Sequence, residues 1–257
     1  MHTSEYPPGV GELVAAEAVQ PEASRAPSFG AKRALWILLS YFLVQIGVGI
    51  VFGMAFALGH IKLSGGPLML MAIVGGVAGS GLAWRMARNS FASQSALDFR
   101  DAIGVRSAPT QQVAIAAAVG LLLSALFGLV LMPMFPPSSP QQLGPLVAAV
   151  SEGGWVLHVC TFFAVCIAPP SEELIFRGVF FAGLARRMSG ILAALISSVA
   201  FVLIHVSSTS PYWPALVAVA LLALAAQLAR VRTGSLVPGI AMHAVYNAAL
   251  FAAAYQH

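Results

Sequence analysis

The sequence predicts an all-α membrane protein, a polytopic bundle of about seven transmembrane helices with six to eight crossings as the range. Of the 257 residues, 59% are hydrophobic and only 9% are charged, which is typical of membrane spans and not of an ordinary soluble domain. The apolar residues also fall in stretches close to the length of about 20 residues that a helix needs to cross a bilayer. No segment shows the ten-residue alternation that is typical of a membrane β-barrel.

The expected spans follow one another with short connections. They cover residues 34–58, 67–86, 112–133, 155–183, 191–208, 213–229 and 236–254. The fourth contains Pro169-Pro170, and because proline lacks an amide donor we expect one helix to end there and another to begin near Ser171. The first three spans contain small residues four apart, which predict close helix packing. These are Gly49 and Gly53, Gly75 and Gly79, and Gly120, Ser124 and Gly128.

The net charge of +4 arises from basic residues that are sorted by loop. They precede the first span and follow the second, fourth and sixth spans: Lys32, Arg33, Arg85, Arg88, Arg100, Arg106, Arg186, Arg187, Arg230 and Arg232. This alternation follows the positive-inside rule and predicts a cytoplasmic N-terminus. Since topology accounts for the basicity, we expect the lipid bilayer as a partner and no nucleic acid.

Three regions are expected along the chain. Residues 1–30 contain four glutamates and no apolar core of a signal peptide, which predicts a disordered cytoplasmic tail. Residues 31–144 form N-terminal transmembrane spans with a basic cytoplasmic loop. Residues 145–257 are expected to be the functional core, because every ionisable candidate at membrane depth lies after residue 150.

Two adjacent glutamates are the only acidic residues expected at membrane depth. Glu173 and Arg177 are four residues apart, so on a helix they share a face and can form an ion pair. Glu172 points about 100° away from Glu173 and has no such partner in its own segment. We therefore interpret Glu173–Arg177 as a structural pair and Glu172 as the carboxylate that remains for chemistry.

Three further polar residues lie in later spans. His205 is in the fifth span, and His243 and Asn247 are four apart on one face of the last span. Taken alone, each could be a buried core residue or a hydrogen-bonding group between helices. At 1.5 Å per residue, however, Glu172 and His205 lie roughly 20 Å from the cytoplasmic ends of their spans, Asn247 roughly 18 Å and His243 roughly 12 Å. We expect all four to line one cavity in the middle of the membrane.

The segments EELIFR (172–177), FVLIH (201–205) and HAVYN (243–247) resemble the EExxxR, FxxxH and HxxxN motifs of the CPBP family, also called the Abi family. That family contains CAAX prenyl proteases and bacteriocin-processing and bacteriocin-immunity proteins. The motifs occur in order within residues 145–254, whereas the first 140 residues match only as generic spans. The resemblance implies an intramembrane endopeptidase with catalytic Glu172, His205, His243 and Asn247, supported by Glu173, Arg177 and Phe201.

The chemistry of these side chains suits peptide hydrolysis, which needs an activated water, a proton donor for the leaving amine and a stabilised oxyanion. Glu172 with His205 can deprotonate water, and His243 with Asn247 can donate to the tetrahedral oxygen. We expect a glutamate protease without a cofactor. The alternative is a metalloprotease in which Glu172, His205 and His243 bind zinc, although no HExxH motif is present.

Two non-enzymatic functions remain as alternatives. One is a bacteriocin-immunity or scaffold protein with the same fold, and the other is an ion- or proton-coupled transporter. The sequence has no evident internal repeat, which disfavours the transporter. For the enzyme we expect a membrane-anchored protein or peptide as substrate, with a prenylated CAAX-type protein as one candidate, in the bacterial cytoplasmic membrane.

Overall fold

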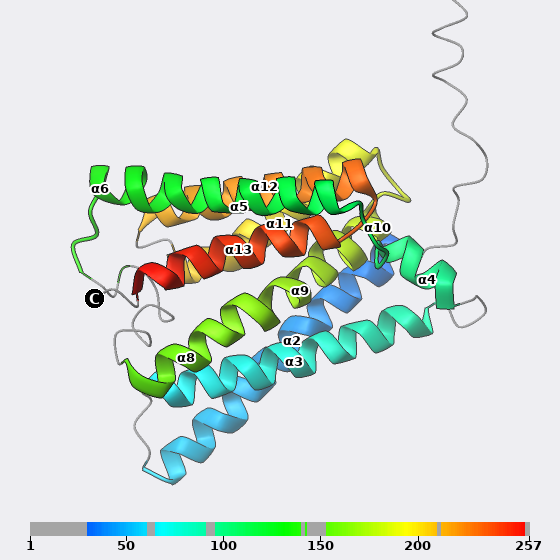
Figure 1. The fold of residues 1–257 in the computed structure, drawn as a ribbon. Coiled ribbons are helices and arrows are strands. Elements are labelled where there is room, and N and C mark those ends of the chain that lie inside the picture. Colours follow the sequence, from blue (N-terminus) through cyan, green and yellow to red (C-terminus); the bar gives the residue numbers. More distant parts are fainter. Residues whose placement is uncertain are drawn as a thin grey trace, which may run out of the picture.

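The computed structural model describes residues 30–60, 65–90, 96–139, 142, 153–209 and 212–254. This part of the chain is helical and contains no strand, so the predicted all-α class is confirmed. The predicted tail over residues 1–30 lies outside the described residues except for Gly30. Figure 1 shows long helices running back and forth across the molecule.

In the first half of the chain, the described residues form three long helices and one short helix. The first two long helices are α2 (Ala31–Leu58) and α3 (Gly65–Asn89), and the short helix is α4 (Ala96–Ile103). The third long helix consists of α5 (Thr110–Ala125), the π-helical segment η2 (Leu126–Leu131) and α6 (Met132–Met134).

The second half contributes four more long helices. One runs without interruption from Gly154 to Leu184. Its segments are α8 (Gly154–Phe162), η4 (Phe163–Ile167), α9 (Ala168–Glu173), η5 (Leu174–Phe180) and α10 (Phe181–Leu184), where η4 and η5 are π-helical. The remaining helices are α11 (Gly190–Thr209), α12 (Trp213–Thr233) and α13 (Val237–Ala254).

The long helices coincide with the predicted spans to within a few residues. Five of them are long and apolar enough to cross a membrane, and α11 and α13 contain shorter apolar stretches, Gly190–Val206 and Val237–Ala252. Large hydrophobic side chains such as Leu58, Leu129 and Leu203 are exposed on their outer faces. Exposed apolar surface on membrane-length helices is suited to lipid, so the protein is an integral membrane protein.

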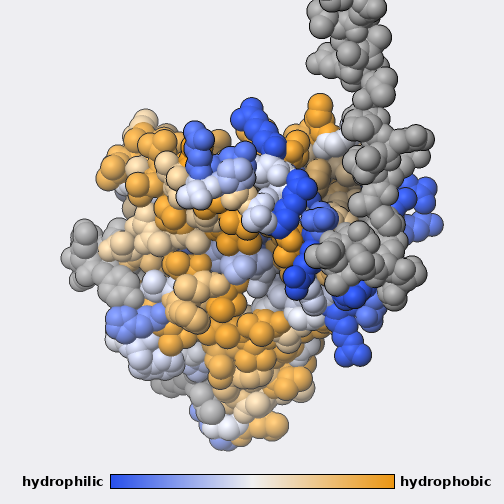
Figure 2. Space-filling view, turned by 45° about the vertical axis from the view of Figure 1, so that its right-hand side comes forward, coloured by the Kyte–Doolittle hydropathy of each residue, from blue (hydrophilic) through white to orange (hydrophobic). Residues whose placement is uncertain are grey.

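The helix ends that carry basic residues lie together at one end of the bundle. The Arg33 side chain of α2 donates to Ser90 after α3, and Arg106 after α4 donates to the Thr233 carbonyl at the end of α12. In Figure 2 this end is turned toward the reader and carries hydrophilic residues, while hydrophobic residues cover the flanks. The alternating up-and-down order predicted from the loop charges is therefore present in the structure.

The prediction that the fourth span breaks at Pro169-Pro170 is wrong, because the helix continues through both prolines. The physical reason is the π-helical segment η4, which comes directly before them. The Ala168 N–H donates to the Phe163 carbonyl, five residues back instead of four. This turn contains one residue more than an α-helical turn, which shifts the backbone hydrogen bonding by one residue. The helix then continues through both prolines.

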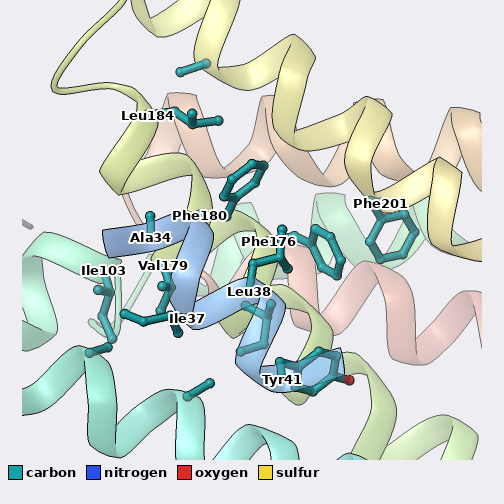
Figure 3. Close-up of a cluster of buried hydrophobic side chains, with 14 of the residues drawn as sticks. Ala34, Ile37, Leu38, Tyr41, Ile103, Phe176, Val179, Phe180, Leu184 and Phe201 are labelled. Atoms are coloured by element: carbon teal, nitrogen blue, oxygen red, sulfur yellow. The ribbon is translucent and has the colours of Figure 1, made fainter. Parts of the chain in front are cut away.

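This long helix lies at the centre of the bundle, between α2 and α3 on one side and α11 and α13 on the other (Figure 1). Side chains of η5, including Phe176, Val179 and Phe180, form the main apolar core with Ile37 of α2 and neighbouring residues (Figure 3). The core therefore fixes the helix that carries the two glutamates.

Only some of the predicted small-residue contacts are close. A Cβ on Gly79 would lie 2.9 Å from the Tyr41 ring, and a Cβ on Gly120 would collide with the Met242 carbonyl of α13. By contrast, Gly53 and Gly128 have no neighbour within 4 Å of an added Cβ. Gly120 matters most for the site, because it lets α5 approach the helix that carries His243 and Asn247.

Candidate active site

Three helices bring Glu172 together with two histidines, although the depth estimate placed His243 at a different level from Glu172 and His205. Glu172 lies on α9, His205 on α11 and His243 on α13. The Glu172 Oε2 atom is 4.0 Å from His205 Nε2 and 3.9 Å from His243 Nε2. One carboxylate oxygen thus faces two imidazole nitrogens from different helices.

The neighbouring glutamate forms the predicted structural pair. Glu173 Oε1 lies 3.2 Å from Arg177 Nη1, and the two side chains are 1% and 0% exposed. Arg177 also donates from Nη2 to the Ala223 carbonyl of α12, at 3.0 Å, and its guanidinium lies 4.1 Å from the centre of the Phe201 ring. A buried charge needs such partners, so this pair is confirmed as part of the protein interior.

Glu172 differs from Glu173 in accessibility. Its side chain is 18% exposed and that of His205 is 24% exposed. Among the described residues, Glu172 Oε2 has no hydrogen-bond partner. Its distances to the two histidines are too long for direct hydrogen bonds, but they suit a water that bonds to the carboxylate and an imidazole at once. Glu172 is thus the more exposed of the two glutamates, although its Oε2 atom is itself buried.

The hydrogen bond of His205 determines which ring nitrogen faces the carboxylate. His205 Nδ1 lies 2.8 Å from the Phe201 carbonyl oxygen. A carbonyl only accepts, so Nδ1 carries the proton, and in the neutral ring Nε2 is an acceptor. That acceptor is the nitrogen that faces Glu172.

His243 lies between both glutamates, a contact that the sequence did not predict. Its Nδ1 is 3.5 Å from Glu173 Oε1, while its Nε2 faces Glu172. Gly239, one turn earlier on α13, makes this approach possible, because a Cβ there would lie 2.8 Å from Glu173 Oε2. Gly239, one turn before His243, is the signal in the sequence that could have indicated the contact between His243 and Glu173.

Phe201, predicted as a supporting residue, lies at the centre of the cluster. Its ring is 1% exposed and packs against the rings of His205 and His243, at centroid distances of 4.6 and 6.0 Å. On another side it meets the Phe176 ring at 5.2 Å, as Figure 3 shows. Phe201 thus contacts both histidines as well as Arg177.

Two supporting residues were missed in the sequence. Ser197 Oγ donates to the Phe176 carbonyl at 2.7 Å, and Arg230 Nε donates to the Arg177 carbonyl at 3.2 Å. Both carbonyls belong to the π-helical segment η5, directly after the glutamates. Arg230 was interpreted only as a topological charge, and no pattern in the sequence pointed to Ser197.

Asn247 contacts the helix of the glutamates at a different level from His243. Its Nδ2 donates to the Ala164 carbonyl in η4, at 2.7 Å. Asn247 and His243 are one turn apart on α13, so one face of α13 contacts the long helix both at the glutamates and before the prolines. One N–H of the Asn247 side chain is therefore used in a hydrogen bond to a backbone carbonyl.

Glu172 lies farther from the two histidines than zinc ligands lie from one another. Ligand atoms around tetrahedral zinc lie about 3.3 Å apart for bonds of about 2.0–2.1 Å. The Glu172 oxygen is farther than that from both histidine nitrogens, at 3.9 and 4.0 Å. Within the described part of the chain, no group of three or more His, Cys, Asp or Glu residues is placed to hold a metal ion.

A comparison with known families gives one match. Residues 153–249 match the family model for Rce1-like proteins, described as type II CAAX prenyl endopeptidase Rce1-like. No curated protein and no solved structure matches the chain significantly. The matched region runs from the start of α8 into α13 and contains all three motifs that resemble the CPBP family. Residues 153–249 of this membrane protein are therefore similar to Rce1-like type II CAAX prenyl endopeptidases.

Proposed function

We propose that the protein is an intramembrane endopeptidase in which Glu172, assisted by His205, activates the attacking water. The observation that carries this proposal is the approach of one Glu172 oxygen to the Nε2 atoms of His205 and His243, at 4.0 and 3.9 Å. The family match supports a protease. The partial exposure of Glu172 and His205 supports access for water, in contrast to the buried Glu173 and Arg177.

In the proposed reaction a water molecule bonds to Glu172 Oε2 and to the acceptor Nε2 of His205. Glu172 takes a proton as the water oxygen attacks the scissile carbonyl carbon, forming a C–O bond and an oxyanion. The oxyanion then collapses, the C–N bond breaks, and Glu172 returns the proton to the leaving amine. Water is consumed and one acid and one amine are formed, so no cofactor is required.

His243 is proposed to stabilise the oxyanion. In this role its ring carries protons on both nitrogens: Nδ1–H faces Glu173 and Nε2–H faces the substrate oxygen. The buried cluster is then balanced, because two carboxylates meet Arg177 and one imidazolium. Asn247 has two N–H groups, so it can offer the second to the oxyanion while the first bonds to Ala164.

The proposed substrate is a membrane-anchored protein or peptide, and the family name makes a prenylated CAAX-type sequence the first candidate to test. The proposed location is a bacterial cytoplasmic membrane, with the N-terminus in the cytoplasm. The basic residues gathered at one end of the bundle support this orientation, because positive loops remain on the cytoplasmic side.

The decisive experiment is a cleavage assay with purified protein in lipid vesicles, using prenylated and unprenylated membrane-anchored peptides. Glu172→Gln keeps the shape of the side chain and removes its basicity, so we expect turnover to fall on the order of 100- to 10,000-fold. Asp101→Asn, on the cytoplasmic helix α4, is the control and retains activity. A folded Glu172→Gln protein that cleaves at the wild-type rate contradicts the proposal.

A further inference from the structure

The two prolines remove two backbone N–H donors from the fourth span, and one carbonyl before them, that of Ala164, accepts a hydrogen bond from a side chain. In η4 the Ala168 N–H donates to the Phe163 carbonyl, five residues back. If this π-helical pairing continues by one residue, the donor for the Ala164 carbonyl is residue 169. That residue is proline, which has no N–H. A carbonyl without a donor is costly at membrane depth, where water does not replace the lost hydrogen bond.

A side chain from another helix supplies this donor. Asn247 Nδ2 lies 2.7 Å from the Ala164 oxygen, a short hydrogen bond between residues 83 positions apart. The amide of Asn247 thus occupies the place of the N–H that Pro169 lacks. The same face of α13 carries His243, whose ring contacts both glutamates.

We propose that Asn247 is a positioning residue, which holds the π-helical register before Pro169 and thereby aims Glu172 at the two histidines. The inference rests on the proposed function of Glu172. A change of one residue in helical register rotates the following side chains by about 100°. If η4 loses its donor and returns to α-helical pairing, Glu172 turns away from His205 and His243, while the sequence of the site is unchanged.

Asn247 could act by positioning Glu172 or by stabilising the oxyanion, and the two roles differ in which groups can replace its side chain. For positioning, any N–H that reaches the Ala164 carbonyl is sufficient. Pro169→Ala restores a backbone N–H at residue 169, so it should make Asn247 dispensable for positioning. For direct donation to the substrate, a backbone N–H at residue 169 changes nothing.

The test compares Asn247→Ala, Pro169→Ala and the double variant in lipid vesicles, with kcat, KM and thermal unfolding measured for each. We expect Asn247→Ala to lower kcat about as much as Glu172→Gln does, on the order of 100- to 10,000-fold, with little change in KM, since Glu172 then points away from both histidines. Pro169→Ala alone should stay near wild type. The double variant should recover the part of the kcat loss that comes from the turned Glu172 and keep the part that comes from the missing second N–H of Asn247.

Pro170→Ala with Asn247→Ala is the matched control, because it adds an N–H one residue later and should not rescue. Pro169→Ser supplies the same N–H as Pro169→Ala if the alanine variant folds poorly. A folded Pro169/Asn247 double variant that is as inactive as Asn247→Ala overturns the inference.

The stability data separate this inference from the proposed function. If Glu172→Gln is fully active, the proposed function fails. The inference about Asn247 is still supported if Pro169→Ala restores the thermal stability lost in Asn247→Ala, and it is refuted if the two losses add.

Discussion

Replacing each of the two adjacent glutamates by glutamine should have different consequences for stability. The substitutions are chemically identical and one residue apart, so each is the control for the other. Glu173→Gln leaves Arg177 buried without its carboxylate, whereas Glu172→Gln changes a side chain that is 18% exposed and has no ion-pair partner closer than 3.9 Å. We expect only Glu173→Gln to destabilise the fold.

The expected loss of stability in Glu173→Gln follows from the burial of the Glu173–Arg177 ion pair. Breaking a buried ion pair by removing one partner costs about 3–5 kcal/mol. Arg177 keeps its bond to the Ala223 carbonyl and its contact with the Phe201 ring, so the lower value of about 3 kcal/mol is the expected one. At about 2–4 °C per kcal/mol for a chain of this size, the Tm of Glu173→Gln should fall by roughly 6–12 °C. Glu172→Gln should stay within about 0.5 kcal/mol of wild type.

The assay is thermal unfolding of the purified variants in one detergent. A double variant, Glu173→Gln with Arg177→Met, removes both charges and should lose less stability than the two single losses added together. Equal Tm losses for the two glutamine variants would refute the division between a structural and a reactive glutamate. Strict additivity in the double variant would refute the ion pair itself.

Three further predictions concern metal, packing and topology. Dialysis against a chelator should leave activity unchanged; stoichiometric zinc that is lost in both His205→Ala and His243→Ala would instead establish a metalloprotease. Gly120→Ala should destabilise the fold by about 1–3 kcal/mol and lower activity, because its Cβ meets the Met242 carbonyl, whereas Gly128→Ala faces open space and should change neither. Reporter fusions after residues 100 and 187 should read cytoplasmic and those after 140 and 210 external. A cytoplasmic signal after residue 140 would contradict the seven-span order.

Features that depend on residues close together in the sequence could be predicted, whereas contacts between distant segments could not. The spans follow from the length of the apolar stretches, and the Glu173–Arg177 pair follows from a spacing of four residues. The continuous helix through Pro169 could not be predicted, because the donor that satisfies Ala164 comes from a helix about 80 residues later. The rule that proline ends a helix is local, and here a contact between distant segments overrides it.

The same limit applies to the site. Depth counting at about 1.5 Å per residue brought Glu172 and His205 to one level and placed Asn247 nearer to that level than His243, whereas in the structure it is His243 that faces Glu172 and Asn247 that bonds to Ala164. It could not show the contact between His243 and Glu173, which depends on how closely α13 approaches α9 at Gly239. Nor could it show that Arg230, a residue assigned to loop charge, donates to the Arg177 carbonyl.

The side-chain hydrogen bonds to the backbone of the fourth span bear on the order in which the protein folds in the bilayer. Side chains of α11, α12 and α13 bond to its carbonyls at Phe176, Arg177 and Ala164, and all three helices are synthesised after it. When the fourth span first enters the membrane, these partners do not yet exist, so its final register must await the last span, which also brings His243. A chain still attached to the ribosome therefore holds Glu172 without its completed surroundings. The proposed catalytic cluster is therefore complete only when the last helix, which carries His243, joins the bundle.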